Sequence, residues 1–199
     1  MKAIKHFILI LTISSFAFTS CKDRTQDVQK LDESTRAYFE IKNDSKYIFT
    51  ELSDTNISIT YTSKNYINNT ANQDIENNEI MSFEMEASGF PTLTFRSESG
   101  GLQFKDRIAM LTKINDSMVI GPVMFNLGGV FSSGFNSGDS IFQYASYDLN
   151  GQTYTDVVRV KPYSHLLYKE VYFAKNIGLI GRKEKNGKFY YLKRYTINK

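Results

Sequence analysis

The chain has 199 residues, with 24 Lys and Arg against 21 Asp and Glu, a single Cys and no Trp. Once a leader is removed, this length suits one domain with a core of ordinary size. The lone cysteine excludes an internal disulfide, and the near balance of charge argues against binding to a polyanion such as DNA.

The first 20 residues have the pattern of an export signal. Two lysines provide a basic start, and the apolar run at 7–19 is too short to span a bilayer stably. The run leads into "FTSC" at 18–21, which resembles the box before the lipidated cysteine of bacterial lipoproteins. The resemblance implies cleavage before Cys21 and acylation of its thiol, for example with palmitate, so that lipid anchors the protein to a membrane. A secreted protein with a chance cysteine is the alternative.

The segment after the cysteine is polar. "KDRTQDVQKLDESTR" at 22–36 has few apolar side chains with which to pack. We therefore divide the chain into a signal peptide (1–20), a tether (21–36) and a single domain (37–199).

The domain shows the two-residue period of β-strands. In "IMSFEMEA" at 80–87, Met81, Phe83 and Met85 fall on one face, and Glu84 and Glu86 fall on the other. Further strand-like runs occupy residues 46–52, 56–62, 90–98, 102–114, 118–127, 140–147, 153–160, 168–174, 177–183 and 188–197.

Two Asn-Gly pairs, at 150–151 and 186–187, lie between such runs and predict tight hairpins with type I′ turns. Polar or glycine-rich stretches at 68–78 and 126–139 predict loops. Apart from a short turn near 164–169, no stretch has a helical period. We predict an all-β fold with little helix, an antiparallel meander of about eight to ten strands curled into a barrel or half-barrel.

Several segments resemble a family of uncharacterised Bacteroidetes-type outer-membrane lipoproteins. "AYFEIKNDSKYIFTEL" at 37–52 is similar to their "YFPLKxGNxWxY" opening, although Glu40 replaces the proline. "GQTYTDVVRV" at 151–160 and "YFAKNIGLI" at 172–180 are similar to their closing motifs and come in the same order. The resemblance implies a half-barrel sheet and an outer-membrane location but no particular activity. In this family a run of acidic residues after the cysteine is associated with export to the cell surface. None follows Cys21, so the resemblance implies a protein that faces the periplasm.

Charge is unevenly distributed along the chain. Residues 21–158 hold 11 Lys and Arg against 19 Asp and Glu, a net of −8, whereas residues 159–199 hold 11 against 2, a net of +9. Acidic and basic strands that neutralise one another within the sheet are the interpretation we favour. A basic face that meets an anionic envelope component is the alternative. Its candidate ligand-binding residues form a basic and aromatic hairpin: Lys185, Lys188, Tyr190 and Arg194.

Candidate catalytic groups are sparse. Glu84 and Glu86 are two residues apart on one strand, about 7 Å, which overlaps the carboxylate separation in glycosidases. Solvation of a polar strand face explains them more simply. His165 is the only histidine after the signal, and neither a G-x-S-x-G elbow nor an H-E-x-x-H motif occurs. We expect no metal and no cofactor, and export argues against nucleic acid as a partner.

These observations predict a lipid-anchored, non-enzymatic protein of the cell envelope that binds an amphiphilic ligand, a glycan or a protein partner. The alternative is an envelope hydrolase acting on glycan or ester substrates, with Glu84, Glu86 or His165 as acid–base groups. That activity requires these side chains to meet in one pocket.

Overall fold

The computed structural model describes residues 28–39, 41–73, 76–100, 106–115, 118–125, 139–163 and 165–198, and Cys21 with its signal lies outside this part. The described residues form one helix, α2 (Glu33–Phe39), and eleven strands. The strands are β1 (Lys46–Glu51), β2 (Ser58–Gln73), β3 (Glu76–Glu86), β4 (Thr92–Glu98), β5 (Arg107–Asn115), β6 (Met118–Phe125), β7 (Ser140–Leu149), β8 (Gln152–Lys161), β9 (Tyr168–Ala174), β10 (Gly178–Glu184) and β11 (Phe189–Thr196).

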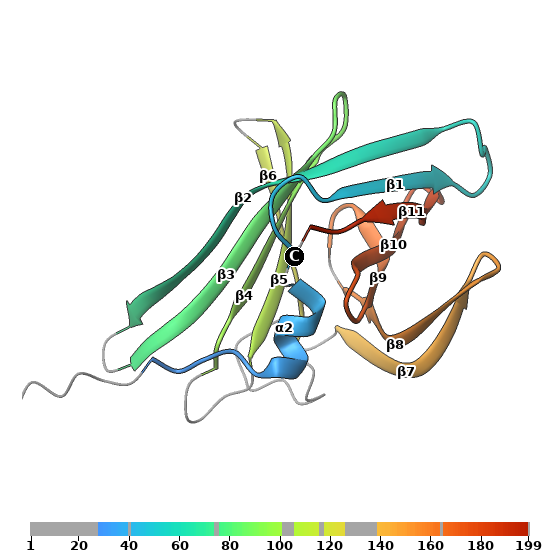
Figure 1. Ribbon diagram of the computed structural model, residues 1–199. Coiled ribbons are helices and arrows are strands. Elements are labelled where there is room, and N and C mark those ends of the chain that lie inside the picture. Colours follow the sequence, from blue (N-terminus) through green and yellow to red (C-terminus); the bar gives the residue numbers. More distant parts are fainter. Residues whose placement is uncertain are drawn as a thin grey trace, which may run out of the picture.

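All eleven strands belong to one antiparallel sheet, in the order β6-β5-β4-β3-β2-β1-β11-β10-β9-β8-β7. Figure 1 shows this sheet curled into an open half-barrel, with β6 and β7 as its edges. The prediction of an all-β meander with little helix is confirmed, although the strands slightly outnumber the range we expected. Strands that are neighbours in sequence pair, except for β6 and β7, which are the two edges, and β1 pairs with β11 and so joins the two halves.

Aromatic side chains fill the interior between the two halves. Phe83 stacks on Phe95 with ring centroids 4.9 Å apart, and Phe95 meets Phe173 of β9 edge-on at 6.3 Å. Helix α2 adds Phe39, whose ring lies 6.0 Å from that of Phe173. Each such ring contributes about 1.5–3 kcal/mol when buried. These ring contacts join β4 to β9, which are not neighbours in the sheet. They therefore stabilise the curvature of the half-barrel.

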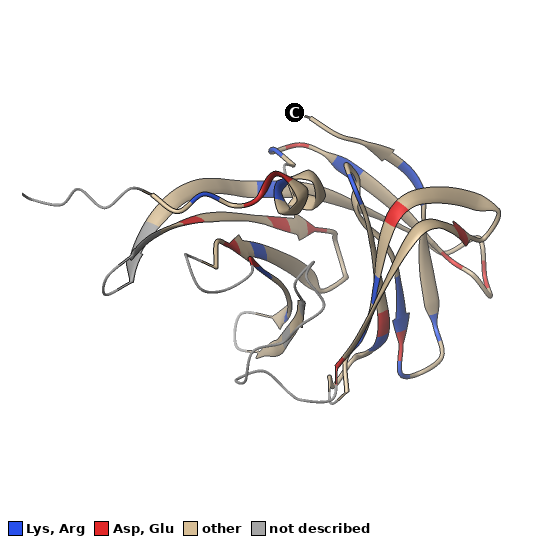
Figure 2. Cartoon of the chain, turned by 90° about the horizontal axis from the view of Figure 1, so that it is seen from below, with Lys and Arg blue, Asp and Glu red and all other residues tan. Residues whose placement is uncertain are grey.

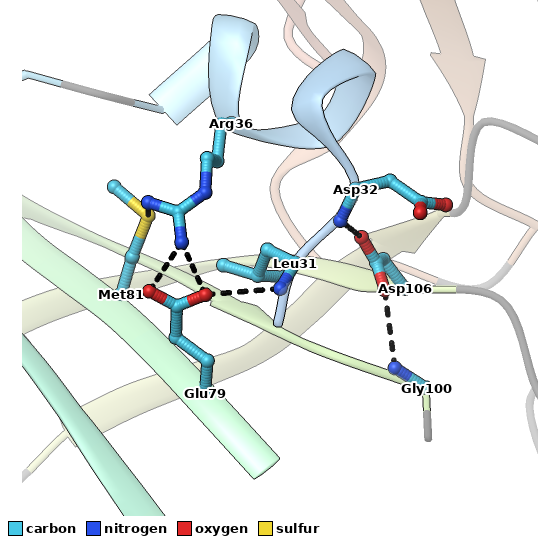
Figure 3. A network of polar contacts seen from close by, with 7 residues as sticks. All are labelled: Leu31, Asp32, Arg36, Glu79, Met81, Gly100 and Asp106. Carbon is cyan, nitrogen blue, oxygen red and sulfur yellow. Dashed lines mark hydrogen bonds and ion pairs between the residues drawn. The ribbon is translucent and has the colours of Figure 1, made fainter. Parts of the chain in front are cut away.

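The polar segment before the domain is packed from residue 29 onwards, so the predicted tether is wrong for its second half. Leu31 is buried, and its N–H donates to Oε2 of Glu79 on β3, 3.0 Å away. Figure 3 shows Arg36 of α2 paired with the same carboxylate. The amino-acid composition of this segment does not predict the contact, because polar groups make most of it.

A second carboxylate holds the start of the helix. Asp106 accepts the N–H of Asp32 at 2.7 Å and that of Gly100 at 3.2 Å (Figure 3). Burial acts to raise the pKa of Glu79, but the Leu31 N–H and the Arg36 guanidinium outweigh it and hold that pKa below its ordinary value. Together the two carboxylates fix α2 against the sheet.

The strand pattern agrees closely with the sequence where one face is buried. Met81, Phe83 and Met85 are all buried. The loop predicted at 68–78 is wrong, because β2 continues to Gln73 and β3 starts at Glu76. This hairpin extends beyond the core, so its backbone pairs while its side chains at 68–70 are exposed and polar. Of the loop predicted at 126–139, only residue 139 is described.

Both Asn-Gly hairpins are present, but only one has the predicted turn. Asn150 and Gly151 have φ of 54° and 79°, as a type I′ turn requires. At the second, Gly187 alone is left-handed, with φ of 93°, and its N–H bonds to the Glu184 carbonyl. This is a three-residue loop, in which the Asn186 side chain accepts the N–H of Lys188. In the described part of 164–169, residues 166 and 167 form a bend and β9 begins at Tyr168, without a helical turn.

Candidate functional site

The three catalytic candidates do not converge. Glu84 accepts a hydrogen bond from the Asn65 amide, and Glu86 forms a 2.9 Å ion pair with Lys64, so both contact β2. His165 precedes β9 and contacts β6 instead. The glutamates therefore share one face of β3, as predicted, but the structure gives them no common site with the histidine.

His165 has a structural environment. Its Nδ1 accepts the N–H groups of Leu167 and Tyr168 at 3.1 and 2.9 Å, which leaves Nε2 to donate to the Gly121 carbonyl at 2.9 Å. The ring stacks on that of Tyr168 with centroids 4.9 Å apart. Burial lowers the pKa of His165, so the ring is neutral near pH 7. Nε2 thus joins the β8–β9 loop to β6, whereas Nδ1 holds the end of that loop and the start of β9.

The predicted basic and aromatic hairpin is not a single surface. Lys185, Lys188 and Arg194 are exposed, but Tyr190 is buried. The Tyr190 ring lies inside the half-barrel, 4.9 Å from the guanidinium carbon of Arg182. Alternation along β11 places Tyr190 inward, and the sequence did not reveal this because both faces of the strand are mixed.

The basic third of the chain occupies one half of the sheet. Strands β9, β10 and β11 pair with one another, with β8 and with β1, whereas the acid-rich β3 pairs only with β2 and β4. Figure 2 shows Lys and Arg spread along the strands of that half. Two ion pairs join the basic third to the rest of the described chain, Lys188–Glu51 at 3.9 Å and Lys175–Asp156 at 3.7 Å. Both are long, so direct neutralisation is weak.

A pocket that the sequence did not predict lies between α2 and the β7–β8 hairpin. Its volume is about 440 Å³. Its lining comes from α2, β7, β8 and the β9–β10 turn: Ser34, Tyr38, Gln143, Tyr144, Ala145, Asp156, Val157 and Lys175. Ser34 and Tyr38 are four residues apart on the helix and so share one of its faces.

Asp156 has an unusual backbone at the wall of this pocket. Its φ is 49°, a left-handed conformation that costs of order 1–3 kcal/mol within a strand. The pairing of β7 with β8 is interrupted at this residue without a change of register. Its carbonyl oxygen accepts instead from the Tyr38 hydroxyl at 2.7 Å and from the Lys175 N–H at 3.3 Å. Strained backbone of this kind is concentrated at binding sites.

The pocket combines aromatic rings with hydrogen-bonding groups. Burial, with the nearby charge of Asp156, raises the pKa of Tyr38 to about 12, so its hydroxyl is a neutral donor. The Tyr144 ring packs on Tyr147 with centroids 4.9 Å apart. Asp156 and Lys175 are half exposed and form only a weak ion pair. The lining thus places a carboxylate, an ammonium group and hydroxyl groups beside two tyrosine rings.

The three segments that resemble the lipoprotein family each contribute a residue to the lining of this pocket. Tyr38 comes from the segment 37–52, Asp156 from 151–160 and Lys175 from 172–180. The N–H of Asn176 also bonds to the Ala37 carbonyl at 2.6 Å. Their order along the chain was visible in the sequence, but their proximity was not, because it depends on how the two halves of the sheet curl together.

Comparison with protein-family models, with curated proteins and with solved structures gives no match. In the part of the chain that the structure describes, no helix is long and apolar enough to cross a membrane. Within the same residues, no group of three or more His, Cys, Asp and Glu side chains lies close enough to hold a metal ion.

Proposed function

We propose that this protein is a lipid-anchored component of the cell envelope that binds a glycan in the pocket beside α2 and does not cleave it. The observation that supports this most directly is the lining of the pocket, where two tyrosine rings stand beside the Asp156 carboxylate and the Lys175 ammonium. Sugars offer hydroxyl groups to such polar side chains and apolar ring faces to aromatic ones.

Binding is favoured over hydrolysis because the carboxylates are in the wrong places. Glycosidases use a pair of carboxyl groups that flank the scissile bond. Asp156 is the one carboxylate among the lining residues, and Glu84 and Glu86 are engaged with β2. His165 has both ring nitrogens in structural bonds.

A sugar suits the site better than an acyl chain does. Fully buried side chains, among them Tyr47, Tyr61 and Phe95, occupy the interior of the half-barrel, where a lipid carrier would hold its cargo. The pocket lies outside this core, and about 440 Å³ is near the lower end of the usual range for ligand sites. A mono- or disaccharide unit fits these properties.

The membrane anchor proposed at Cys21 places this pocket near the lipid. Ser34 follows the cysteine by 13 residues, a length that spans at most about 45 Å when fully extended. We therefore propose that the bound glycan belongs to the layer nearest the outer membrane, on its periplasmic side. Loss of palmitate labelling in Cys21→Ser, with labelling retained in Ser20→Ala, tests the anchor, and retained labelling in Cys21→Ser contradicts it.

A panel of envelope glycans, made of lipopolysaccharide core oligosaccharides and muropeptides, tests the ligand. Calorimetry of the mature chain is expected to detect binding to one class, weakened about tenfold by Asp156→Asn, which removes a charged hydrogen-bond partner. Glu86→Gln is the matched control, because it breaks a comparably exposed ion pair elsewhere on the sheet. Equal affinity in Asp156→Asn and wild type, or release of sugar fragments, contradicts the proposal.

A further inference from the structure

One end of the half-barrel exposes large apolar side chains on two elements, the β5–β6 hairpin and the β8–β9 loop. Figure 1 shows this hairpin at the top of the molecule. We refer to the exposed apolar residues here as the apolar rim: Ile114, Met118, Val119, Tyr163 and Leu166. Tyr163 and Leu166 are the most exposed, at 76% and 73%.

A bond described above brings the two parts of the rim together. His165, between Tyr163 and Leu166, contacts the carbonyl of Gly121, which follows Val119 by two residues. Two residues of strand span about 7 Å, so the two elements lie close together at this point. Single exposed apolar residues are ordinary, but a contiguous group of this kind marks an interaction surface.

Basic residues surround the rim. The N–H of Lys185 bonds to the carbonyl of Leu167, which places the exposed β10–β11 turn beside the β8–β9 loop. Lys169 is exposed three residues after Leu166.

Two carboxylates lie near the same turn and loop, and both are engaged. Asp139 accepts the N–H of Tyr163 at 2.7 Å, and Glu184 accepts from the Asn186 amide at 2.9 Å. Their charges offset part of the lysine charge, and the segment 183–188 around the β10–β11 turn holds three Lys against one Glu.

We propose that the apolar rim docks onto an anionic bilayer surface. Tyr163, Leu166 and Val119 enter the region between headgroups and acyl chains, while Lys185 and its neighbours contact lipid phosphates. A tyrosine suits this depth because its ring is apolar and its hydroxyl remains hydrated.

The shape and charge of the rim favour a bilayer over a protein partner. The residues project from a hairpin and a loop and are fringed by lysine, whereas the core of a protein interface is depleted in lysine. The rim and the glycan pocket lie on different elements, so this proposal does not depend on the proposed function.

Vesicle sedimentation tests the docking without the lipid anchor. The mature chain carrying Cys21→Ser is mixed with vesicles of phosphatidylcholine alone or with added phosphatidylglycerol. We expect binding to the anionic vesicles, weakened by high salt, and a loss of about tenfold or more in Tyr163→Ser/Leu166→Ser. Circular dichroism and the thermal midpoint establish that the variant is folded.

The matched control is Leu52→Ser/Ile67→Ser, because both side chains are 48% exposed but lie on β2 and the β1–β2 turn. Its binding should equal that of the parent chain. Absence of binding to anionic vesicles, equal binding to neutral ones, or equal loss in both double variants overturns the proposal. Concentration-dependent dimerisation that the Tyr163→Ser/Leu166→Ser change abolishes also overturns it, since the rim would then bind a second copy.

Discussion

The hydroxyl of Tyr38 donates to the carbonyl oxygen of Asp156, 2.7 Å away and 118 residues later in the chain. This bond joins the helix that begins the domain to a strand of its second half. The same carbonyl accepts the N–H of Lys175, at the point where the pairing of β7 with β8 is interrupted. One phenol group therefore ties this wall of the pocket to the helix.

Removal of that hydroxyl should loosen the pocket and lower stability. For Tyr38→Phe, we expect a loss of about 1 kcal/mol in the free energy of unfolding, because the Asp156 carbonyl loses a buried donor. Urea denaturation measures this change. Tyr163→Phe is the control, since the Tyr163 side chain is largely exposed. Equal stability in the two variants would show that the bond contributes nothing.

Gly178 packs closely against the end of the same helix. Its φ is 89°, and a Cβ there would lie 2.9 Å from Cδ1 of Ile41 and 3.4 Å from the carbonyl oxygen of Tyr38. Gly178→Ala should therefore cost about 1–3 kcal/mol in stability and weaken ligand binding as well. Gly121→Ala is the control, because nothing lies within 4 Å of the added methyl group. Thermal unfolding compares the two variants, and a Gly178→Ala protein as stable as wild type contradicts this account.

Glu79 predicts a loss of stability in acid. Its pKa is lower in the folded protein than in the unfolded chain, so the unfolded chain binds more protons as the pH falls. The stabilisation is present above the unfolded pKa of about 4.3 and is lost as the pH falls through the folded value. Glu79→Gln should be less stable at pH 7 and should show a shallower decline in acid. Urea unfolding across this pH range measures how the free energy of unfolding of each protein depends on pH. Parallel pH dependences in wild type and Glu79→Gln would exclude Glu79 as the source of the loss.

His165 predicts a separate decline at higher pH. Because burial lowers its pKa in the folded protein, the unfolded chain takes up a proton first, below about pH 6.5. Stability should therefore fall as the pH decreases through this value, and His165→Asn should lack that step. The variant should also be less stable at pH 7.5, by about 1–3 kcal/mol, because the buried N–H of Tyr168 loses its acceptor. A step that persists in the variant would assign it to another group.

Strands that bury one face could be predicted from the sequence, and the two features that depend on polar contacts could not. Met81, Phe83 and Met85 alternate with polar residues, and β9 occupies the predicted residues 168–174. Helix α2 has too few apolar residues to show a period, and Glu79 and Asp106 hold its start. The long β2–β3 hairpin likewise has the polar composition of a loop, because exposed strands need only backbone bonds.

The candidate site shows a different limit. The chemistry of their side chains makes Glu84, Glu86 and His165 candidates, but the glutamates contact β2 and the histidine contacts β6, so they share no site. No sequence motif marks Tyr38, Asp156 and Lys175 as site residues, because they lie in three separate segments of the chain. Only the curl of the sheet brings these segments together, and curl is a property of all eleven strands at once.

The pairing of β1 with β11 sets the order in which the molecule can assemble. Strands β1–β6 and β7–β11 are each chains of local hairpins, and Lys46 opposite Thr196 connects residues near the two ends of the domain. Closing so long a loop is slow compared with forming a hairpin. The half-barrel therefore completes only after the last strand has been synthesised, and a chain cut before residue 189 would leave β1 without one of its two neighbours.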